Sequence, residues 1–227
     1  LAFGAGTDTL QFATTGAYDL TSLTAANISG LEVVDAAGRA GADTVTVSKA
    51  FVATATGGTL TVMGTAASDG VALSDASNWM YVGTVNWDPG SGSRSFYQYK
   101  SNDGGLSTLN VQSNLASTPG IIYYGAGLND VFSAASHSFT TMVGGTGTDS
   151  VAFADGDYNM VGLQTKMTGM DVIDAATHAG VDTVTVNKAF VAGAGESATI
   201  NVLGTAATDT FQFADASSWT WVGEVSG

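Results

Sequence analysis

Residues 143–153 read VGGTGTDSVAF, a glycine-rich loop that leads directly into a run of alternating apolar residues. A loop of this kind can bind a phosphate, make a tight turn, or bind a metal ion through its carbonyl oxygens. Phosphate-binding loops carry a lysine or lead into a helix. Here no lysine follows, and the alternation after Asp149 is typical of a half-buried strand. The stretch therefore predicts a turn or a metal-binding loop in front of a β-strand.

The chain is an internal duplication. GTGTDSVAF at 145–153 repeats GAGTDTLQF at 4–12, and DTVTV occurs at 43–47 and again at 182–186. The repeat distance stays close to about 140 residues along the chain, which indicates two copies of one module. The second copy stops before the aromatic extension that follows the first one. We therefore expect its last part to come from a continuing chain or a neighbouring subunit.

Short alternating strands follow Gly, Asp and Asn clusters throughout both copies. Together with the duplication, this pattern predicts an all-β fold, a parallel β-solenoid or β-roll built from two duplicated modules. Aromatic runs separated by DPGSGSR and KSNDGG predict an antiparallel β flap at about 84–112. The expected segments are a first solenoid module with its flap, a connecting RTX-like segment and a truncated second module, at 1–112, 113–143 and 144–227.

Three loops fit the pattern G-G-x-G-x-D-x-U-x, in which U is a bulky apolar residue. This nonapeptide binds calcium, a hard cation that takes about 6–8 oxygen ligands. Residues 144–152 fit in full. The loop at 3–11 lacks the first glycine, and the loop at 124–132 has Asn129 at the aspartate position with Asp130 directly after it. The candidate ligand residues are Gly4, Gly6, Asp8, Gly125, Gly127, Asn129, Asp130, Gly144, Gly145, Gly147 and Asp149.

The alternative is that these loops are Gly-Asp turns between strands and hold no metal. Four further aspartates precede strands without the glycine pattern: Asp43, Asp69, Asp182 and Asp209. We expect these side chains to bind their local backbone in Asx turns.

Composition excludes several classes of partner. The formal net charge is −14, from 20 acidic against 6 basic residues, so the surface repels nucleic acid and anionic lipid. No apolar run approaches the ~20 residues that span a bilayer, and we expect no membrane insertion. Cysteine is absent, so bound metal is a natural stabilising element in place of disulfides. With two histidines outside the duplicated pattern and no G-x-S-x-G motif, we expect no enzyme.

Two aromatic pairs are part of the duplication. Trp79 and Tyr81 match Trp219 and Trp221, and two residues of separation place each pair on one side of a strand. Such a pair either fills the solenoid or forms an exposed platform that stacks on sugars.

With YGAGLNDVF (124–132), VGGTGTDSVAF (143–153) and the following GLEVVD-type strands, the chain resembles the repeat modules of bacterial type I-secreted RTX surface proteins and adhesins, the hemolysin-type calcium-binding family. The resemblance covers nearly the whole chain, although the consecutive nonapeptides of RTX toxins are missing. It implies Ca²⁺ as the cofactor and an extracellular place on a bacterial cell surface.

We therefore expect a structural or adhesive module of a calcium-dependent secreted surface protein, such as an S-layer subunit, a surface filament or a giant adhesin. A solenoid has open sheet ends, so self-association head-to-tail or in a lattice is expected. The alternatives are a secreted carbohydrate-binding module with a glycan or cell-surface ligand, and an RTX accessory part of a secreted enzyme.

Overall fold

The computed structural model divides into two compact units, Leu1–Ile122 and Tyr123–Gly227, which are described separately. The three segments expected from the repeat pattern stay a prediction, because compactness does not define where a repeat begins. The described residues are 1–37, 41–65, 68–88, 92–125, 127–194, 198–205 and 208–223.

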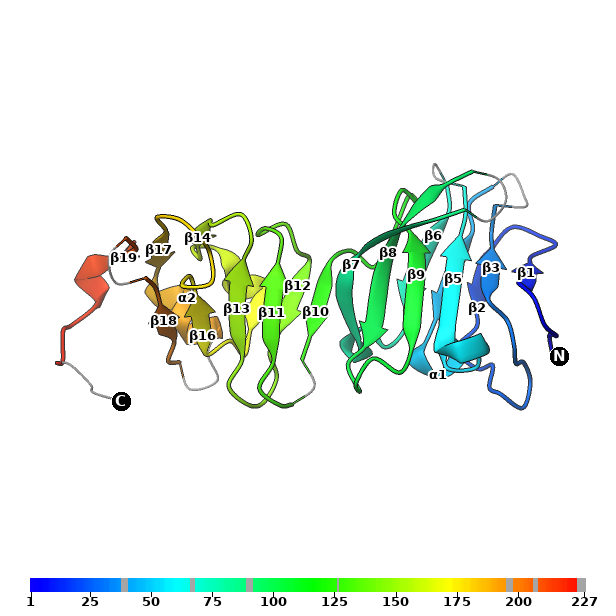
Figure 1. The fold of residues 1–227 in the computed structure, drawn as a ribbon, viewed down its shortest axis with the longest axis horizontal. Coiled ribbons are helices and arrows are strands. Elements are labelled where there is room, and N and C mark those ends of the chain that lie inside the picture. Colours follow the sequence, from blue (N-terminus) through cyan, green and yellow to red (C-terminus); the bar gives the residue numbers. More distant parts are fainter. Residues whose placement is uncertain are drawn as a thin grey trace. The chain divides into compact units, whose positions relative to one another are not determined.

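The first unit is a parallel β-solenoid whose successive turns each add one strand to two stacked sheets (Figure 1). One sheet has the order β1-β3-β5-β9-β8-β7 and the other the order β2-β4-β6. The solenoid strands are β1 (Thr9–Gln11), β2 (Ala17–Asp19), β3 (Val33–Asp35), β4 (Thr44–Val47), β5 (Thr59–Met63) and β6 (Gly70–Leu73).

The predicted antiparallel flap is confirmed. It consists of β7 (Trp79–Trp87), β8 (Arg94–Ser101) and β9 (Thr108–Gln112), with β8 antiparallel to both neighbours. Residues 89–91 of the predicted flap lie outside the described residues. The last flap strand has a second role that the sequence did not indicate: β9 also pairs in parallel with β5, so it forms the next rung of the solenoid.

The second unit is also a parallel solenoid, with three sheets in the orders β10-β12-β15, β11-β13-β16-β18 and β14-β17-β19. The pairs β11–β13, β12–β15, β13–β16, β14–β17, β16–β18 and β17–β19 are parallel. Its strands are β10 (Ile122–Tyr124), β11 (Val131–Ala134), β12 (Thr141–Val143), β13 (Ser150–Phe153), β14 (Tyr158–Asn159), β15 (Met167–Thr168), β16 (Val172–Asp174), β17 (Thr183–Val186), β18 (Asn201–Leu203) and β19 (Thr210–Phe213). The expected all-β parallel solenoid is therefore confirmed.

The alternating sequence explains which side chains form the core. In β4, Val45 and Val47 are buried while Thr44 is exposed, and β17 repeats the pattern with Val184 and Val186. A period of two places alternate residues on one face of a strand, so the valines fill the solenoid and the threonines face outward.

Two short helices follow these matching strands, and the sequence pattern did not predict them. They are α1 (Lys49–Val52) and α2 (Lys188–Ala194). The side-chain oxygens of Ser48 and Asn187 accept the Phe51 and Phe190 backbone N–H at 3.3 and 2.8 Å, as N-cap residues do. No helix among the described residues is long and apolar enough to cross a membrane.

Candidate functional site

Two of the three predicted calcium loops stack directly on one another. The loop at 125–130 precedes β11, the loop at 144–149 precedes β13, and these strands pair in parallel with Val131 opposite Ser150. This register places Asp130, rather than Asn129, at the level of Asp149. Asn129 has a different contact: its Oδ1 accepts the Thr148 backbone N–H at 2.9 Å.

Glycine is required in this stack because the backbones of neighbouring turns approach closely. A Cβ atom on Gly125 would overlap the carbonyl oxygen of Gly144, and one on Gly144 would overlap the carbonyl oxygen of Gly169. Such overlap with main-chain atoms is not relieved by a side-chain rotation. The glycines at these positions therefore bring carbonyl oxygens of successive turns together.

A ladder of carboxylates runs through the same stack. The Asp130 backbone N–H donates to Asp149 Oδ1 at 2.8 Å, and the Asp149 backbone N–H donates to Asp171 Oδ2 at 3.0 Å. Asp149 and Asp171 thus each accept a hydrogen bond from the aspartate one turn earlier. Hydrogen bonds to a charged acceptor are roughly twice as strong as neutral ones, so the ladder joins consecutive turns.

The remaining predicted loop lies in the first unit and has a similar contact. The Asp8 backbone N–H donates to Glu32 Oε2 at 2.7 Å, and Glu32 occupies the place that Asp171 has in the second copy. No second glycine-rich loop of the pattern lies against it among the described residues. A Cβ atom on Gly4 or Gly6 would have open space around it, in contrast to Gly125 and Gly144.

A second column of the ladder involves the four aspartates that lack the glycine pattern. The Asp43 N–H donates to Asp69 Oδ1 at 3.0 Å. In the second unit the matching residues make the same contact, and the Asp182 N–H donates to Asp209 Oδ1 at 3.1 Å. The Gly16 N–H donates to Asp43 Oδ1 at 2.6 Å. The expectation of Asx turns was therefore wrong in its main point: the contacts cross between turns, because parallel pairing aligns the residues that precede each strand.

Asp69 and Asp209 also accept a hydrogen bond from their local backbone, but from the residue four positions earlier, which is not an Asx turn. The Thr65 backbone N–H donates to Asp69 Oδ2 at 2.6 Å, and Thr205 donates to Asp209 in the same way. The hydrogen bond from Thr205, followed by those from Asp182 and Thr208, holds the pKa of Asp209 below its ordinary value.

The donor set of the loops suits calcium, which prefers oxygen ligands. Two carboxylate oxygens at the loop of the first unit, Asp8 Oδ2 and Glu32 Oε1, are buried and have no hydrogen-bond partner among the described residues. Asp43 Oδ2 is buried in the same way. Among the described residues, these loops included, no three or more His, Cys, Asp or Glu side chains converge to hold a metal ion. The loops therefore fit an ion bound by backbone carbonyls and one or two carboxylates.

Sequence reasoning missed Glu32 and Asp171 as members of the ladder. The available signal was position: an acidic residue stands directly before a strand in nearly every turn, including GLEVV and GMDVI. Only the parallel register shows that these residues, 19 to 27 positions apart, contact one another.

The duplicated aromatic pairs have different environments in the two copies. Trp79 is fully buried and its indole N–H donates to Asp75 Oδ1 at 3.0 Å, so it fills the solenoid. Trp219 makes the same bond to Asp215 but is only partly buried, and Trp221 is 79% exposed.

Comparison of the chain with models of known protein families, with curated proteins and with solved structures gives no match. The argument for function therefore rests on the loops, the ladder and the ends of the two units.

Proposed function

We propose that the chain is a calcium-dependent structural module of a secreted bacterial surface protein of the RTX type, acting in an S-layer, a surface filament or an adhesin. The observation that carries the proposal is the turn-on-turn stacking of the loops at 125–130 and 144–149, which collects carbonyl and carboxylate oxygens at one edge of the solenoid. Calcium is the cation whose ligand preference matches that collection.

Electrostatics supports a cation in this place. The chain carries a net charge of −14, and the ladder places Asp130, Asp149 and Asp171 one turn apart in a single column. Like charges in such a column repel one another, and repulsion is stronger where burial lowers the local dielectric. A divalent ion bound by Asp130, Asp149 and the loop carbonyls would neutralise this charge and join two turns. In the first unit, Asp8 and Glu32 would hold the corresponding ion.

A structural role agrees with what the rest of the molecule offers. Both units are built from short stacked turns, and β18 lies at the edge of its sheet, where a strand can pair with a further strand. Repetition of such a contact without closure produces a filament or a lattice. Head-to-tail self-association is therefore part of the proposal.

Thermal unfolding with calcium and with a chelator tests the proposal. One ion bound only by the folded state stabilises it by about 2.7 kcal/mol at a hundredfold excess over its dissociation constant. We expect the melting temperature to rise with calcium in the wild type and to rise much less in Asp149→Asn. Asparagine keeps one oxygen for the Asp130 N–H, but it removes the charge and replaces the second carboxylate oxygen by an NH2 group.

Asp155→Asn is the matched control, because Asp155 is exposed and its carboxylate accepts the nearby Asp157 N–H. It should keep the full response to calcium. If calcium leaves the melting temperature of the wild type unchanged, the proposal is wrong. An equal response in wild type and Asp149→Asn would remove the 144–149 loop from the site.

Carbohydrate binding is a second candidate, favoured by the exposure of Trp221 beside Trp219. A glycan array of wild type against Trp221→Ala tests it, and equal binding patterns would exclude this pair as a sugar platform.

A further inference from the structure

The flap of the first unit borders a polar pocket, which we call the flap pocket. Its volume is about 400 Å³, within the range of about 300–1,000 Å³ that is typical of small-molecule sites. Its lining combines the indole of Trp87 with the polar side chains of Gln11, Asp35 and Arg94. The pocket therefore offers an aromatic wall and several hydrogen-bonding groups to one ligand.

The floor of the flap pocket is the outer face of a solenoid sheet. In the paired strands β1 and β3, Thr9 lies opposite Val33 and Gln11 lies opposite Asp35. Residues two positions apart share one face of a strand, and Val34, between the two floor residues of β3, is fully buried on the other face. The floor is thus a side of the solenoid and not one of its ends.

The wall of the flap pocket is the far end of the β7–β8 hairpin, which bends over the sheet toward β3 (Figure 1). Val33 and Met63 of the sheet form a small outer core with Phe96 of β8, and Trp87 packs against this core. The Trp87 and Phe96 ring centroids lie 6.0 Å apart. Trp87 is only partly buried and also lines the pocket, so this contact holds the indole in place beside the pocket.

The polar side chains are held in position by hydrogen bonds. Gln11 Nε2 donates to Asp35 Oδ2 at 3.0 Å, and Asp35 Oδ1 accepts the Ala37 backbone N–H at 2.9 Å. Arg94 Nη1 donates to Gln112 Oε1 at 2.9 Å. An amide has two N–H donors and one oxygen, and a carboxylate accepts up to about four hydrogen bonds, so Gln11 and Asp35 can also bind a ligand.

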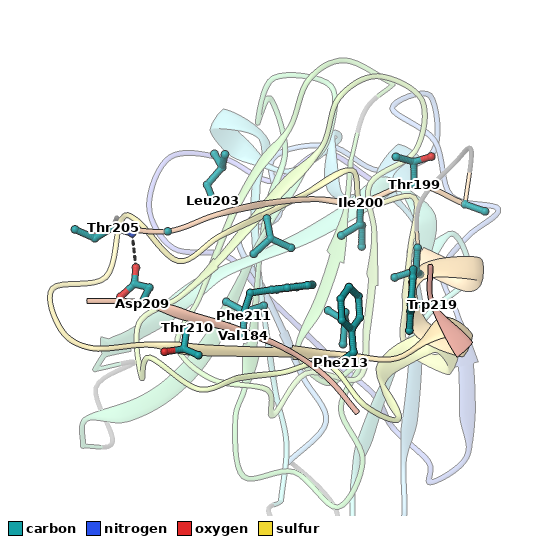
Figure 2. Close-up of a pocket in the computed structure, with 15 residues that line it drawn as sticks. Val184, Thr199, Ile200, Leu203, Thr205, Asp209, Thr210, Phe211, Phe213 and Trp219 are labelled. Atoms are coloured by element: carbon teal, nitrogen blue, oxygen red, sulfur yellow. Dashed lines mark hydrogen bonds between the residues drawn. The ribbon is translucent and has the colours of Figure 1, made fainter. Parts of the chain in front are cut away.

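The open groove of the second unit has a different chemistry. It has a volume of about 580 Å³, and Phe211 and Phe213 point into it, with Ile200 pointing toward them (Figure 2). Ile200 and Phe211 are the counterparts of Leu60 and Val71 in the first unit, and the walls of the groove are mainly aliphatic and aromatic. The flap pocket, in contrast, combines one aromatic wall with a guanidinium, an amide and a carboxylate.

We propose that the flap pocket binds a saccharide. A pyranose ring has a face of C–H groups that packs on the Trp87 indole, and neighbouring hydroxyl groups that pair with the Gln11 amide and the Asp35 carboxylate. The Arg94 guanidinium donates to a further sugar oxygen. The inference goes beyond the proposed structural function and involves neither the ion nor Trp221.

Other classes of ligand match this lining less well. A wholly apolar ligand would remove water from Asp35 and Arg94 and supply no hydrogen bonds in return. A small anion would face the Asp35 carboxylate in a chain whose net charge is −14, and it would make no use of the indole.

The duplication supplies a mild variant for the test. The position of Gln11 is Ala152 in the second unit, whereas Asp35 is matched by Asp174. Gln11→Ala therefore introduces a residue that the same module already carries, at an exposed position. We expect this variant to fold like the wild type.

Saturation-transfer NMR of the full chain in calcium, titrated with the methyl glycosides of glucose, galactose, mannose and N-acetylglucosamine, tests the proposal. We expect saturable binding of at least one glycoside, with a dissociation constant on the order of 1 mM. Gln11→Ala should weaken it about tenfold, and so should Trp87→Leu, which keeps an apolar side chain against Val33 and Met63. Asn86→Ala is the matched control, because Asn86 is exposed and its side chain lies on the opposite face of β7 from Trp87.

Amide and indole ¹⁵N spectra of the wild type locate the bound glycoside. The side-chain amide of Gln11 and the indole N–H of Trp87 should shift, and the indole N–H groups of Trp79 and Trp221 should not. Absence of saturable binding by all these glycosides, equal binding by Gln11→Ala and wild type, or shifts at Trp221 in place of Trp87 would overturn the proposal. The thermal test of the proposed function contains no sugar, and the titration keeps calcium constant, so either proposal can fail without the other.

Discussion

The backbone N–H of Asp130 donates a hydrogen bond of 2.8 Å to the carboxylate of Asp149, one solenoid turn later in the chain. The contact joins two glycine-rich loops whose aspartates lie 19 residues apart in the sequence. It makes Asp149 both a candidate calcium ligand and a structural residue, and these two roles can be separated by substitution.

Replacing the buried Asp149 by alanine removes the carboxylate that accepts the Asp130 backbone N–H. A buried donor that loses its acceptor costs about 1–3 kcal/mol. We therefore expect Asp149→Ala to lower the free energy of unfolding by this amount in a chelator, measured by urea denaturation. Asp149→Asn should lower the free energy of unfolding much less, because the amide oxygen of asparagine can accept the same hydrogen bond. Equal losses would show that the charge, and not the hydrogen bond, carries the stabilisation.

The close approach of the loops predicts an asymmetry between two glycines. Gly144→Ala forces a Cβ against the Gly169 carbonyl oxygen, and we expect a loss of about 1–3 kcal/mol or more. Gly4→Ala is the control, because no atom lies within 4 Å of its added Cβ. Its effect on the free energy of unfolding, measured by urea denaturation, should stay within about 0.5 kcal/mol. A destabilising Gly4→Ala would mean that the loop at 3–8 has a contact that the first unit does not show.

The two copies of the duplicated tryptophan predict different costs for the same change. Trp79 is fully buried, so Trp79→Ala should cost about 3–5 kcal/mol. Trp219 lies at the open groove, and Trp219→Ala should cost a smaller amount, about 1–2 kcal/mol. Circular dichroism during denaturation measures both. Similar losses would indicate that the groove is closed in solution.

We expect His137 to make the stability of the fold depend on pH. Its ring stacks on Phe153 with centroids 4.1 Å apart, and burial lowers its pKa below the ordinary 6.5 although Asp157 and Asp155 act in the opposite direction. The unfolded chain therefore binds a proton more readily than the folded one. Stability from the neutral ring is present above about pH 6.5 and is lost as the pH falls toward the lowered pKa of the folded state.

Unfolding free energies measured from pH 7.5 to pH 5 test this. The wild type should lose stability across this range more steeply than His137→Phe, whose ring can keep the stacking contact with Phe153 and cannot be protonated. Identical slopes in the two proteins would contradict the prediction.

Much of the fold follows from local pattern. DTVTV at 43–47 and 182–186 alternates strictly, and the structure buries Val45, Val47, Val184 and Val186 in strands. The aromatic runs before Gln112 predict the flap correctly, although β7 begins at Trp79, earlier than expected. The helix α1 was missed because four residues are too few to display a helical period, and its Ser48 cap is also compatible with a turn.

The candidate site was only partly predictable from the sequence, because local pattern shows the loops but not the contacts between turns. The glycines and aspartates of 144–149 are recognisable in the sequence, because turn geometry and ligand chemistry act over a few residues. The ladder partners are not, because Asp149 and Asp171, or Asp43 and Asp69, meet only when parallel strands pair in one particular register.

The amino-acid sequence by itself determined the β class, the duplication and the oxygen-rich character of the loops, since each depends on residue type and spacing along the chain. Tertiary structure alone decided which carboxylate meets which backbone N–H, and that β9 serves both as a flap strand and as the turn that covers Leu60 and Val62. Among the described residues, it also leaves an open pocket at the matching residues Ile200 and Phe211. The reason is physical: burial and strand pairing depend on which segments lie against a turn, and those segments come from distant parts of the sequence.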